Sequence, residues 1–301
     1  MDNKDFKYYI SYFAKEFSNL EHNRPWLSFD ENNIVVSSTK NLASKFGVDT
    51  SEYGDYYYHP CEIAQAVCAY YDLYIESNDK RYIDLLFSNI KWLSDNYVEY
   101  KDTYVYPFPF AIKTFGEKEG WISGMYQGII LSAFIRSSIL SNDNSFTTAI
   151  QKVYNSYSLK LGDKYGFMVE DEYGLWYEES MLNQPTHILN GFVYAIYGLA
   201  DYYKFSKDEE AGINLNKCYQ TLENTIPHFD MGYWSFYDLN GTIASYDYHN
   251  KMHIPILYSL YELTGKDIFK EYAIKWQTYS TSKICKLRKK IYSFKKRFFN
   301  I

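Results

Sequence analysis

The sequence has few cysteines, no long apolar run and no recognisable export signal, and each absence excludes a class of protein. Its four cysteines stand at positions 61, 68, 218 and 285, without a CxxC pair or a spacing typical of a disulfide framework or a metal site. No stretch of about 18 apolar residues occurs, and the charged N-terminal stretch lacks a hydrophobic signal core. We therefore expect a cytoplasmic protein that does not span a membrane.

Acidic residues are absent from positions 281–301, which carry eight basic residues. This tail has a charge of +8, so the remainder must carry −14 to give the net charge of −6. An acidic body argues against nucleic acid as a partner. Apolar residues recur in the tail at every third or fourth position: Ile284, Leu287, Ile291, Phe294 and Phe298. Two interpretations stay open for residues 284–298: peripheral contact with an anionic membrane at its cytoplasmic face, or docking of the apolar stripe on the body as a last outer helix.

Tyrosine, by contrast, is abundant, with 35 residues in a chain of 301. A tyrosine combines a large ring with a hydroxyl group, so an excess suits an aromatic groove that stacks on sugar rings. Compositional drift in an AT-rich genome would also raise the tyrosine count. The 47% hydrophobic content is enough for a substantial core.

From residue 56 the chain repeats a pattern of two helices. Proline at a helix start, short polar turns and helical periodicity predict these pairs: 60–77 with 80–97, 120–140 with 145–157, 187–205 with 208–226, and 251–263 with 267–279. The first helix of each pair is the more apolar, as an inner helix would be. A repeat of roughly 60 to 67 residues indicates an array of α-hairpins.

Aromatic segments at 104–115, 165–179 and 233–248 separate the pairs, and their alternating patterns predict short strands and loops on one rim. The predicted fold is mainly α: an incomplete (α/α) toroid of helical hairpins with short β segments lining the cleft. We divide the chain into an irregular lead-in (1–55), the toroid (56–280) and the basic tail (281–301). In the lead-in we expect an amphipathic helix over 1–20, with Phe6, Ile10, Phe13 and Phe17 on one face, and a strand at 33–38.

Two adjacent carboxylates, Glu178 and Glu179, lie just before the break at Pro185 and the helix predicted from His187. The positive end of a helix favours the charged form of nearby carboxylates, which then serve as proton acceptors or bind sugar hydroxyls. An ordinary acidic capping turn would give the same pattern.

Six segments of the sequence are informative when taken together and in this order: YYYHPCEIAQ (56–65), GWISGMYQG (120–128), LWYEE (175–179), ILNGFVYAIYGLADYY (188–203), SFYDL (235–239) and DYHNKMHI (247–254). Together they resemble the C-terminal helical domain of D-glucuronyl C5-epimerases, which convert glucuronate into iduronate within heparan-type chains. The resemblance covers about residues 50–280. It implies an incomplete toroid with a polysaccharide groove, no redox cofactor and a homodimer.

Removal of the C5 proton of a uronate needs a base, an acid on the other face, and stabilisation of an enediolate-like intermediate. By motif position, the resemblance assigns these catalytic roles to Glu179, Tyr237 and Tyr248. Contacts with substrate are expected from these residues: Tyr58, His59, Gln127, Tyr177, Glu178, Asn190 and His249.

The sequence departs from the family pattern at two positions. Ser180 replaces a tyrosine that follows the second glutamate, and Asn240 replaces an arginine that follows the YDL motif. The first change removes an acid/base candidate, and the second removes a cation for the substrate carboxylate. The candidates to replace the tyrosine are Tyr177, Tyr173 and Tyr246, and those for the arginine are Lys251 and Arg136.

Two further motifs have a structural and a functional interpretation. His249 and His253 have a spacing that could bind zinc on a helix, but no third ligand is evident, so we expect no metal and assign His249 to substrate contact or to positioning Tyr248. Gly124 and Gly128 indicate close helix packing rather than a phosphate loop.

These observations lead to one functional hypothesis and its alternatives. We expect a uronosyl C5-epimerase-like enzyme that acts on an acidic polysaccharide or lipid-linked glycan by proton abstraction and reprotonation. A uronate-directed lyase or glycoside hydrolase on the same toroid, or a non-catalytic glycan-binding protein, would share most of these features.

Overall fold

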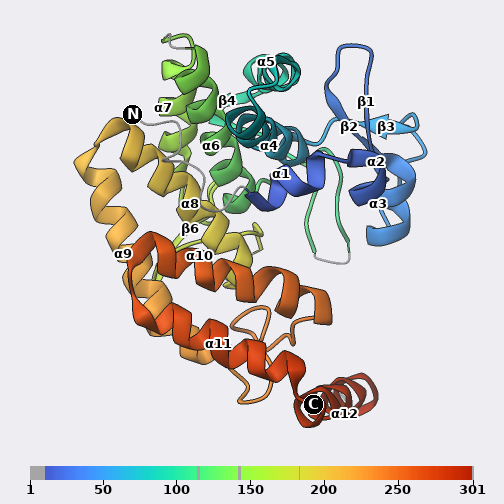
Figure 1. Cartoon of the computed structure of the whole chain (residues 1–301), viewed down its shortest axis with the longest axis vertical. Helices are drawn as coiled ribbons and strands as arrows, with labels where there is room; N and C mark the ends of the chain where they lie inside the picture. The colour runs from blue at the N-terminus through green and yellow to red at the C-terminus, as the bar shows by residue number, and fades with distance from the viewer. Residues whose placement is uncertain (1–10, 114–115, 142–143, 183, 300–301) are drawn as a thin grey trace.

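Helical hairpins make up most of the chain. The computed structural model describes residues 11–113, 116–141, 144–182 and 184–299. Within these residues, four hairpins follow one another: α4 (Pro60–Ser77) with α5 (Lys80–Asp95), α6 (Gly124–Ser141) with α7 (Thr147–Asn155), α8 (Leu189–Ser206) with α9 (Glu209–Thr225), and α10 (Ile254–Thr264) with α11 (Asp267–Thr281). They form an open arc from the top through the left to the bottom of Figure 1. The predicted incomplete (α/α) toroid is confirmed.

Local capping interactions explain where the first hairpin begins and turns. Pro60 occupies the first turn of α4, and His59 Nδ1 accepts a hydrogen bond of 3.2 Å from the Cys61 N–H. The helix ends at Asn78, whose φ of 56° is left-handed, and Asp79 then caps α5 by accepting from the Arg81 N–H at 3.0 Å. These residues made the turn predictable from sequence.

The predicted start of the fourth inner helix is wrong. A π-helix spanning Tyr248–His253 precedes α10 and is continuous with it, so this helical segment begins about one turn before residue 251. Its wider turns carry Tyr248, His249 and His253, which are considered below. Single π-turns inside helices often occur at functional sites.

The inner helices α6 and α8 pack closely because glycines face each other between them. A Cβ atom at Gly128 would lie 2.5 Å from the Tyr194 carbonyl oxygen, and one at Gly198 would lie 2.4 Å from the Gly128 carbonyl oxygen. Both distances are too short for any other residue. The structural interpretation of Gly128 is therefore confirmed.

The strands are short and connect the helices. An antiparallel sheet is formed by β1 (Leu27–Phe29), β2 (Val35–Ser38) and β3 (Tyr56–Tyr57) in the order β1-β2-β3. Two-stranded ribbons are formed by β4 (Val98–Tyr100) with β5 (Thr103–Val105) and by β6 (Met168–Asp171) with β7 (Gly174–Tyr177). The segment 233–248 forms isolated bridges, such as Phe236 with Ile243. Short 3₁₀ turns at Ser156–Ser158 and Ile226–Phe229 follow α7 and α9.

The lead-in packs on the first hairpin. It contains α1 (Ser11–Phe17), α2 (Leu20–Asn23) and α3 (Thr39–Phe46). Phe13 and Phe17 are buried as predicted, and the Phe17 ring meets that of Tyr70 on α4 edge-on at 5.9 Å. Phe6 and Ile10 lie outside the described residues. The division of the chain into three parts stays a prediction.

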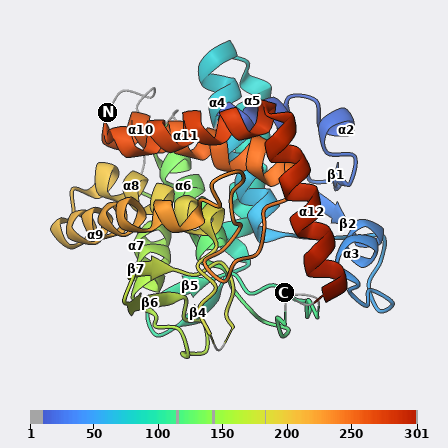
Figure 2. The ribbon, with the colours of Figure 1, turned by 90° about the horizontal axis from the view of Figure 1, so that it is seen from below.

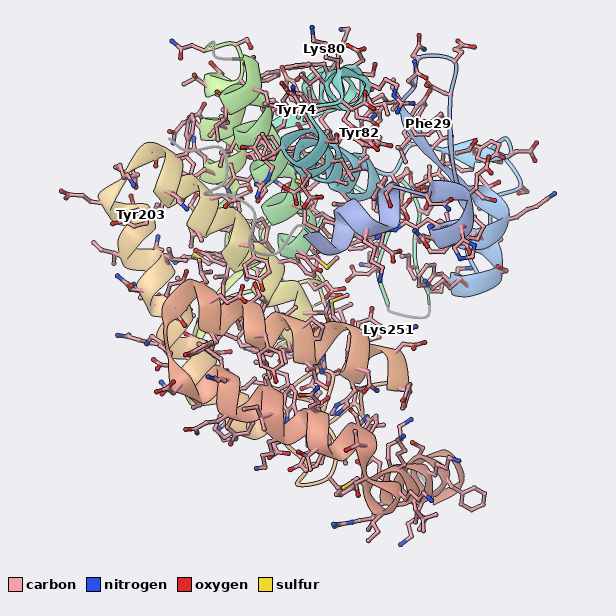
Figure 3. The ribbon with its side chains drawn as sticks, viewed as in Figure 1. Phe29, Tyr74, Lys80, Tyr82, Tyr203 and Lys251 are labelled. Atoms are coloured by element: carbon pink, nitrogen blue, oxygen red, sulfur yellow. The ribbon has the colours of Figure 1, made fainter. Side chains whose placement is uncertain are left out.

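The C-terminal helix α12 (Lys283–Phe299) follows the last hairpin and runs at a steep angle to α10 and α11 in Figure 2. Its apolar residues are exposed, which contradicts the interpretation that the stripe docks on the body: Ile284, Leu287, Ile291 and Phe294. Polar side chains and tyrosines are exposed elsewhere on the surface, such as Lys80 and Tyr203 in Figure 3. Among the described residues, no helix has the length and apolar character required to cross a bilayer.

Candidate active site

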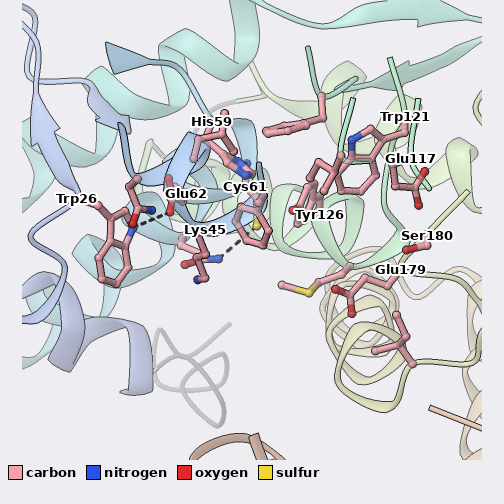
Figure 4. A pocket seen from close by; sticks show the side chains of 18 of the residues that line it. Trp26, Lys45, His59, Cys61, Glu62, Glu117, Trp121, Tyr126, Glu179 and Ser180 are labelled. Carbon is pink, nitrogen blue, oxygen red and sulfur yellow. Dashed lines mark hydrogen bonds between the residues drawn. The ribbon is translucent and has the colours of Figure 1, made fainter. Parts of the chain in front are cut away.

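A cavity of about 280 Å³ lies where the lead-in, the first two inner helices and the aromatic connecting segments meet. Figure 4 shows Trp26 and Glu62 on one side and Glu179 and Ser180 on the other. The lining residues come from sequence positions far apart: Trp26, Asn41, Leu42, Lys45, Phe46, Tyr57, His59, Cys61, Glu62, Gln65, Phe108, Ile112, Glu117, Trp121, Met125, Tyr126, Glu179, Ser180, Ile188, Tyr237 and Tyr248. All three residues with a predicted catalytic role, Glu179, Tyr237 and Tyr248, are among them.

Glu179 owes its position to both neighbouring inner helices. It follows β7 and Glu178, whose carbonyl accepts from the Gly124 N–H at the start of α6 at 2.9 Å. On the other side, Asn190 Nδ2 of α8 donates to Glu179 Oε2 at 3.3 Å. A Cβ atom at Gly191 would lie 2.4 Å from that same oxygen, so α8 can approach Glu179 only because residue 191 is glycine.

The surroundings of Glu179 suit a general base near neutral pH. Burial, together with the nearby charge of Glu178 and a smaller effect of Glu117, raises the pKa of Glu179 to about 7, against a partial lowering by the Asn190 hydrogen bond. A carboxylate with such a pKa can accept a proton and return it under the same conditions. This result differs from the sequence-based expectation that the helix N-terminus would favour the charged form, because desolvation outweighs the helix dipole here.

Tyr237 lies in the connection after α9 and Tyr248 at the start of the π-helix, and the buried Ser235 joins these two parts of the chain. Ser235 Oγ lies 2.7 Å from His249 Nδ1 and 3.0 Å from His253 Nδ1. His249 Nε2 lies 3.0 Å from the Trp276 carbonyl oxygen, which can only accept, so Nε2 carries the proton and Nδ1 accepts from Ser235. The network holds the segment before Tyr237 against the π-helix that carries Tyr248.

The two tyrosines interact directly and remain protonated at neutral pH. Their rings meet edge-on with centroids 5.0 Å apart, and the interaction between their hydroxyl groups contributes to the pKa of each. Burial and the nearby charge of Glu179 raise the pKa of Tyr237 far above its usual value, and the same two causes raise the pKa of Tyr248 to about 12, against the opposing effect of the Tyr237 hydrogen bond. Protonated phenols beside a carboxylate of higher than normal pKa can act as proton donors.

The opposite wall contains residues that the sequence analysis did not single out. Trp26 Nε1 donates to Glu62 at 3.1 Å, and the Ser37 hydroxyl also donates to Glu62. Trp26 and Lys45 belong to the lead-in (1–55), for which the sequence predicted a helix and a strand but no site residue. No local motif identifies them, because only the packing of β1 to β3 and α3 on α4 brings them to the cavity.

Of the predicted substrate-binding residues, His59 alone lines the cavity in the described structure. Its ring meets that of Tyr126 edge-on at 5.3 Å, and burial lowers the pKa of His59, which favours the neutral imidazole. The sequence signal for His59 was its position before the helix-starting Pro60.

Six residues predicted to contact substrate are not among the side chains that line the cavity: Tyr58, Gln127, Tyr177, Glu178, Asn190 and His249. Tyr58 donates to Asp30 at 2.8 Å and stacks on Trp92. Gln127 is fully buried and donates to the Tyr104 carbonyl and to Ser156.

The remaining four of these residues pack against, or hydrogen-bond to, the segments that carry the lining residues. Tyr177 is buried against Tyr157, with ring centroids 4.7 Å apart. Glu178 is buried and accepts from the backbone N–H groups of Thr186 and His187, at 3.1 and 3.0 Å, which closes the loop before α8. Asn190 holds Glu179, and His249 positions the Tyr248 segment, as one of its two sequence interpretations anticipated.

The candidates for the two departures from the family pattern are also placed elsewhere. Tyr173, Tyr177 and Tyr246 do not line the cavity; Tyr246, for example, stacks on Trp234. The tyrosines that do line it are Tyr57, Tyr126, Tyr237 and Tyr248.

Neither cation proposed for the missing arginine reaches the cavity. Arg136 is fully buried in an ion pair with Asp201 at 2.6 Å, and Lys251, labelled in Figure 3, pairs with Asp247 at 3.0 Å. Lys45 is the one lysine or arginine among the described lining residues.

His249 and His253 are buried together against tryptophan rings, and burial lowers the pKa of each, to about 4 and about 3. Among the described residues, no group of three or more His, Cys, Asp or Glu side chains is arranged to hold a metal ion.

Comparison with known proteins decides the family. The sequence model of the family described as D-glucuronyl C5-epimerase C-terminus matches residues 99–278, which is more than half of the chain. The chain belongs to this family. The matched range of this C5-epimerase C-terminal domain includes Glu179, Tyr237 and Tyr248.

Two relatives share the domain at low identity. The D-glucuronyl C5-epimerase of Caenorhabditis elegans is 26% identical over 186 residues, which are 56% of this chain and 30% of that protein. A protein of Methanocaldococcus jannaschii described as uncharacterized is 22% identical over 177 residues, 58% of this chain and 57% of that protein. The matches thus span less than two thirds of either relative.

Solved structures show the same fold outside the C5-epimerase family. The GH76A α-1,6-mannanase of a Salegentibacter species has a TM-score of 0.54 at 14% identity, over 90% of this chain and 70% of that chain. The cellobiose 2-epimerase of Bacillus thermoamylovorans has a TM-score of 0.55 at 12% identity, over 92% of this chain and 75% of that chain.

Proposed function

We propose that the protein is a carbohydrate epimerase whose cavity binds a uronosyl residue of an acidic polysaccharide or lipid-linked glycan and inverts its C5 centre. The observation that carries this proposal is the meeting of Glu179, Tyr237 and Tyr248 in one cavity. Membership of the C5-epimerase family supports it further.

In the proposed reaction, Glu179 takes the C5 proton, and the electron pair of the broken C–H bond moves into the uronate carboxyl group as an enediolate. Tyr248 gives a proton to C5 from the other face of the ring, and the hydrogen bond from Tyr237 stabilises the phenolate that forms. Return of the proton from Glu179 to Tyr248 resets the site. C5 begins and ends in the same oxidation state, so the proposed reaction requires no redox cofactor.

Charge in the cavity supports a role for Lys45. The enediolate carries more negative charge on the carboxyl oxygens than the substrate does, and a cation near them lowers the barrier. Since Lys45 is the one lysine or arginine among the described lining residues, we assign it to the substrate carboxylate. Lys45 lies on α3, whereas the arginine that the resemblance implies would stand at position 240, in the segment that carries Tyr237.

A uronate lyase is the second candidate, because Ser180 and Asn240 depart from the pattern that the resemblance implies. A lyase removes the same C5 proton but then expels the substituent at C4. An altered set of proton donors would favour this outcome over reprotonation at C5.

Product analysis separates the candidates. The protein is incubated with a polysaccharide of alternating glucuronate and N-acetylglucosamine in deuterated water, and the sugar signals are followed by NMR. Deuterium at C5 with iduronate signals and an unchanged chain length supports the epimerase. An unsaturated uronate at a new chain end would establish a lyase, and shorter chains without unsaturation would indicate a hydrolase.

A further inference from the structure

The apolar stripe of α12 faces away from the body of the protein. Ile284, Leu287, Ile291 and Phe294 are 72%, 58%, 48% and 58% exposed, whereas Cys285 and Tyr292 on the other side of the helix are partly buried. Four large exposed apolar side chains on one helix face indicate an interaction surface rather than a packing face.

Two cation–π contacts attach the helix to the body. Arg288 lies over the Tyr233 ring at 4.3 Å, and Lys286 lies over the Tyr246 ring at 5.7 Å. These contacts turn the other side of α12 outward, where Lys283, Lys290 and Lys295 are exposed beside the apolar stripe.

We propose that α12 is a docking surface for an anionic lipid bilayer, on which the helix lies parallel to the membrane plane. Acyl chains would take up the apolar stripe, and anionic headgroups would pair with the exposed lysines. A helix of 17 residues extends about 25 Å along the surface.

Charge favours a bilayer over a second copy of this chain. Residues 281–301 carry eight basic side chains and no acidic one, so two such helices facing each other across a two-fold axis would repel. The remainder of the chain carries −14, so its repulsion from an anionic surface would leave α12 as the element that makes the contact. A bilayer accommodates the apolar stripe and the positive charge at the same time.

Docking would also affect the position of the cavity. Tyr233 and Tyr246, which contact α12, belong to the segment that carries Tyr237 and to the turn before Tyr248. The cavity would therefore be held near the headgroup layer, where a lipid-linked glycan would be within reach. This consequence rests on the proposed function, whereas the docking itself does not.

Vesicle co-sedimentation tests the proposal with the full-length protein. The probes are vesicles of phosphatidylcholine alone and of phosphatidylcholine mixed in equal parts with phosphatidylglycerol. We expect binding to the mixed vesicles only, weakened by added salt. Ile291→Ser should reduce the affinity about tenfold, and the triple change Lys283→Gln, Lys290→Gln and Lys295→Gln should reduce it on the order of a hundredfold.

Matched controls come from the rest of the surface. Ile274→Ser on α11 changes an isoleucine of nearly equal exposure, 49%, and the triple change Lys80→Gln, Lys160→Gln and Lys207→Gln removes the same charge from exposed sites elsewhere. Both controls should bind like the unchanged protein.

Three results would overturn the proposal. The first is that the unchanged protein fails to bind the mixed vesicles. The second is that the control triple change weakens binding as much as the α12 triple change. The third is a dimer in sedimentation equilibrium that Ile291→Ser dissociates without any vesicle binding, which would make α12 a contact between copies.

None of these results bears on exchange at C5 of a soluble glycan, so the proposed function is tested separately.

Discussion

The ring of Tyr237 meets that of Tyr248 edge-on, with centroids 5.0 Å apart and an angle of 84° between the ring planes. Tyr237 lies in the segment that follows α9, and Tyr248 begins the π-helix at the end of that segment; the network of Ser235, His249 and His253 joins the two parts. In the proposed mechanism, this arrangement suits Tyr248 as the proton donor and Tyr237 as its hydrogen-bond partner.

Replacing the donor hydroxyl should abolish most of the activity. Tyr248→Phe keeps the ring contact with Tyr237 but removes the proton, so kcat should fall about 100-fold or more. Tyr246→Phe is the matched control, because Tyr246 lies two positions away, is similarly exposed and does not line the cavity. Equal activity of the two variants would remove Tyr248 from the proposed mechanism.

Gly191 should be required for the position of Glu179. In Gly191→Ala, the new methyl group would lie 2.5 Å from Glu179 Cβ as well as close to its carboxylate, so the whole side chain must move. A displacement on the order of 1 Å should lower kcat about 100-fold, although alanine favours a helix more than glycine does. Gly54→Ala, which meets no atom within 4 Å, should keep full activity in the same assay.

Lys45 should determine affinity for the charged substrate. In Lys45→Gln the uronate carboxylate loses its cation, and we expect KM to rise about tenfold or more. Lys40→Gln removes an exposed lysine from the same helix α3 outside the cavity and should leave KM unchanged. A glycan whose carboxyl groups have been reduced to alcohols separates the effect of charge from other binding interactions. The unchanged protein and Lys45→Gln should bind this neutral glycan equally well.

Glu179 should reduce the stability of the folded protein at high pH. Its pKa rises from 4.5 to about 7 on folding, so the folded state holds this proton more tightly than the unfolded state. The resulting stabilisation is complete below pH 4.5 and is lost as the pH rises through about 7. Glu179→Gln removes this dependence, and its free energy of unfolding above pH 7 should exceed that of the unchanged protein by about 1 to 3 kcal/mol. Denaturant titrations at both ends of this pH range would reveal it, and an equal difference at both would contradict the assigned pKa.

The helical hairpins could be predicted from sequence because their signals are local. Pro60, Asp79 and Asp208 mark helix starts, and the apolar periodicity of the inner helices is continuous. The meeting of Glu179, Tyr237 and Tyr248 in one cavity was predicted from the family resemblance, and their catalytic roles stay a prediction. The sequence could not assign Glu178, because a carboxylate that closes a loop and one that faces a cavity have the same local pattern.

The other wall of the cavity depends on packing between distant segments. Lys45 stands in a polar helix with no motif, and Trp26 stands in an irregular stretch. The contact of β2 with α4 brings Trp26 to Glu62, and both Trp26 and Lys45 line the cavity. The role of His249 also depends on distant segments. The sequence allowed either substrate contact or positioning of Tyr248, and the hydrogen bonds of His249 with Ser235 and the Trp276 carbonyl favour positioning. The homodimer stays a prediction.

The central claim is that Glu179 removes the proton from C5 of a uronosyl residue. The most direct measurement is the rate of deuterium incorporation at C5 in deuterated water, compared between the unchanged protein, Glu179→Gln and the control Glu170→Gln, whose side chain is exposed on β6. We predict incorporation that rises with pH through about 7, persists in Glu170→Gln and is lost in Glu179→Gln. Incorporation that continues at the same rate in Glu179→Gln would contradict the account.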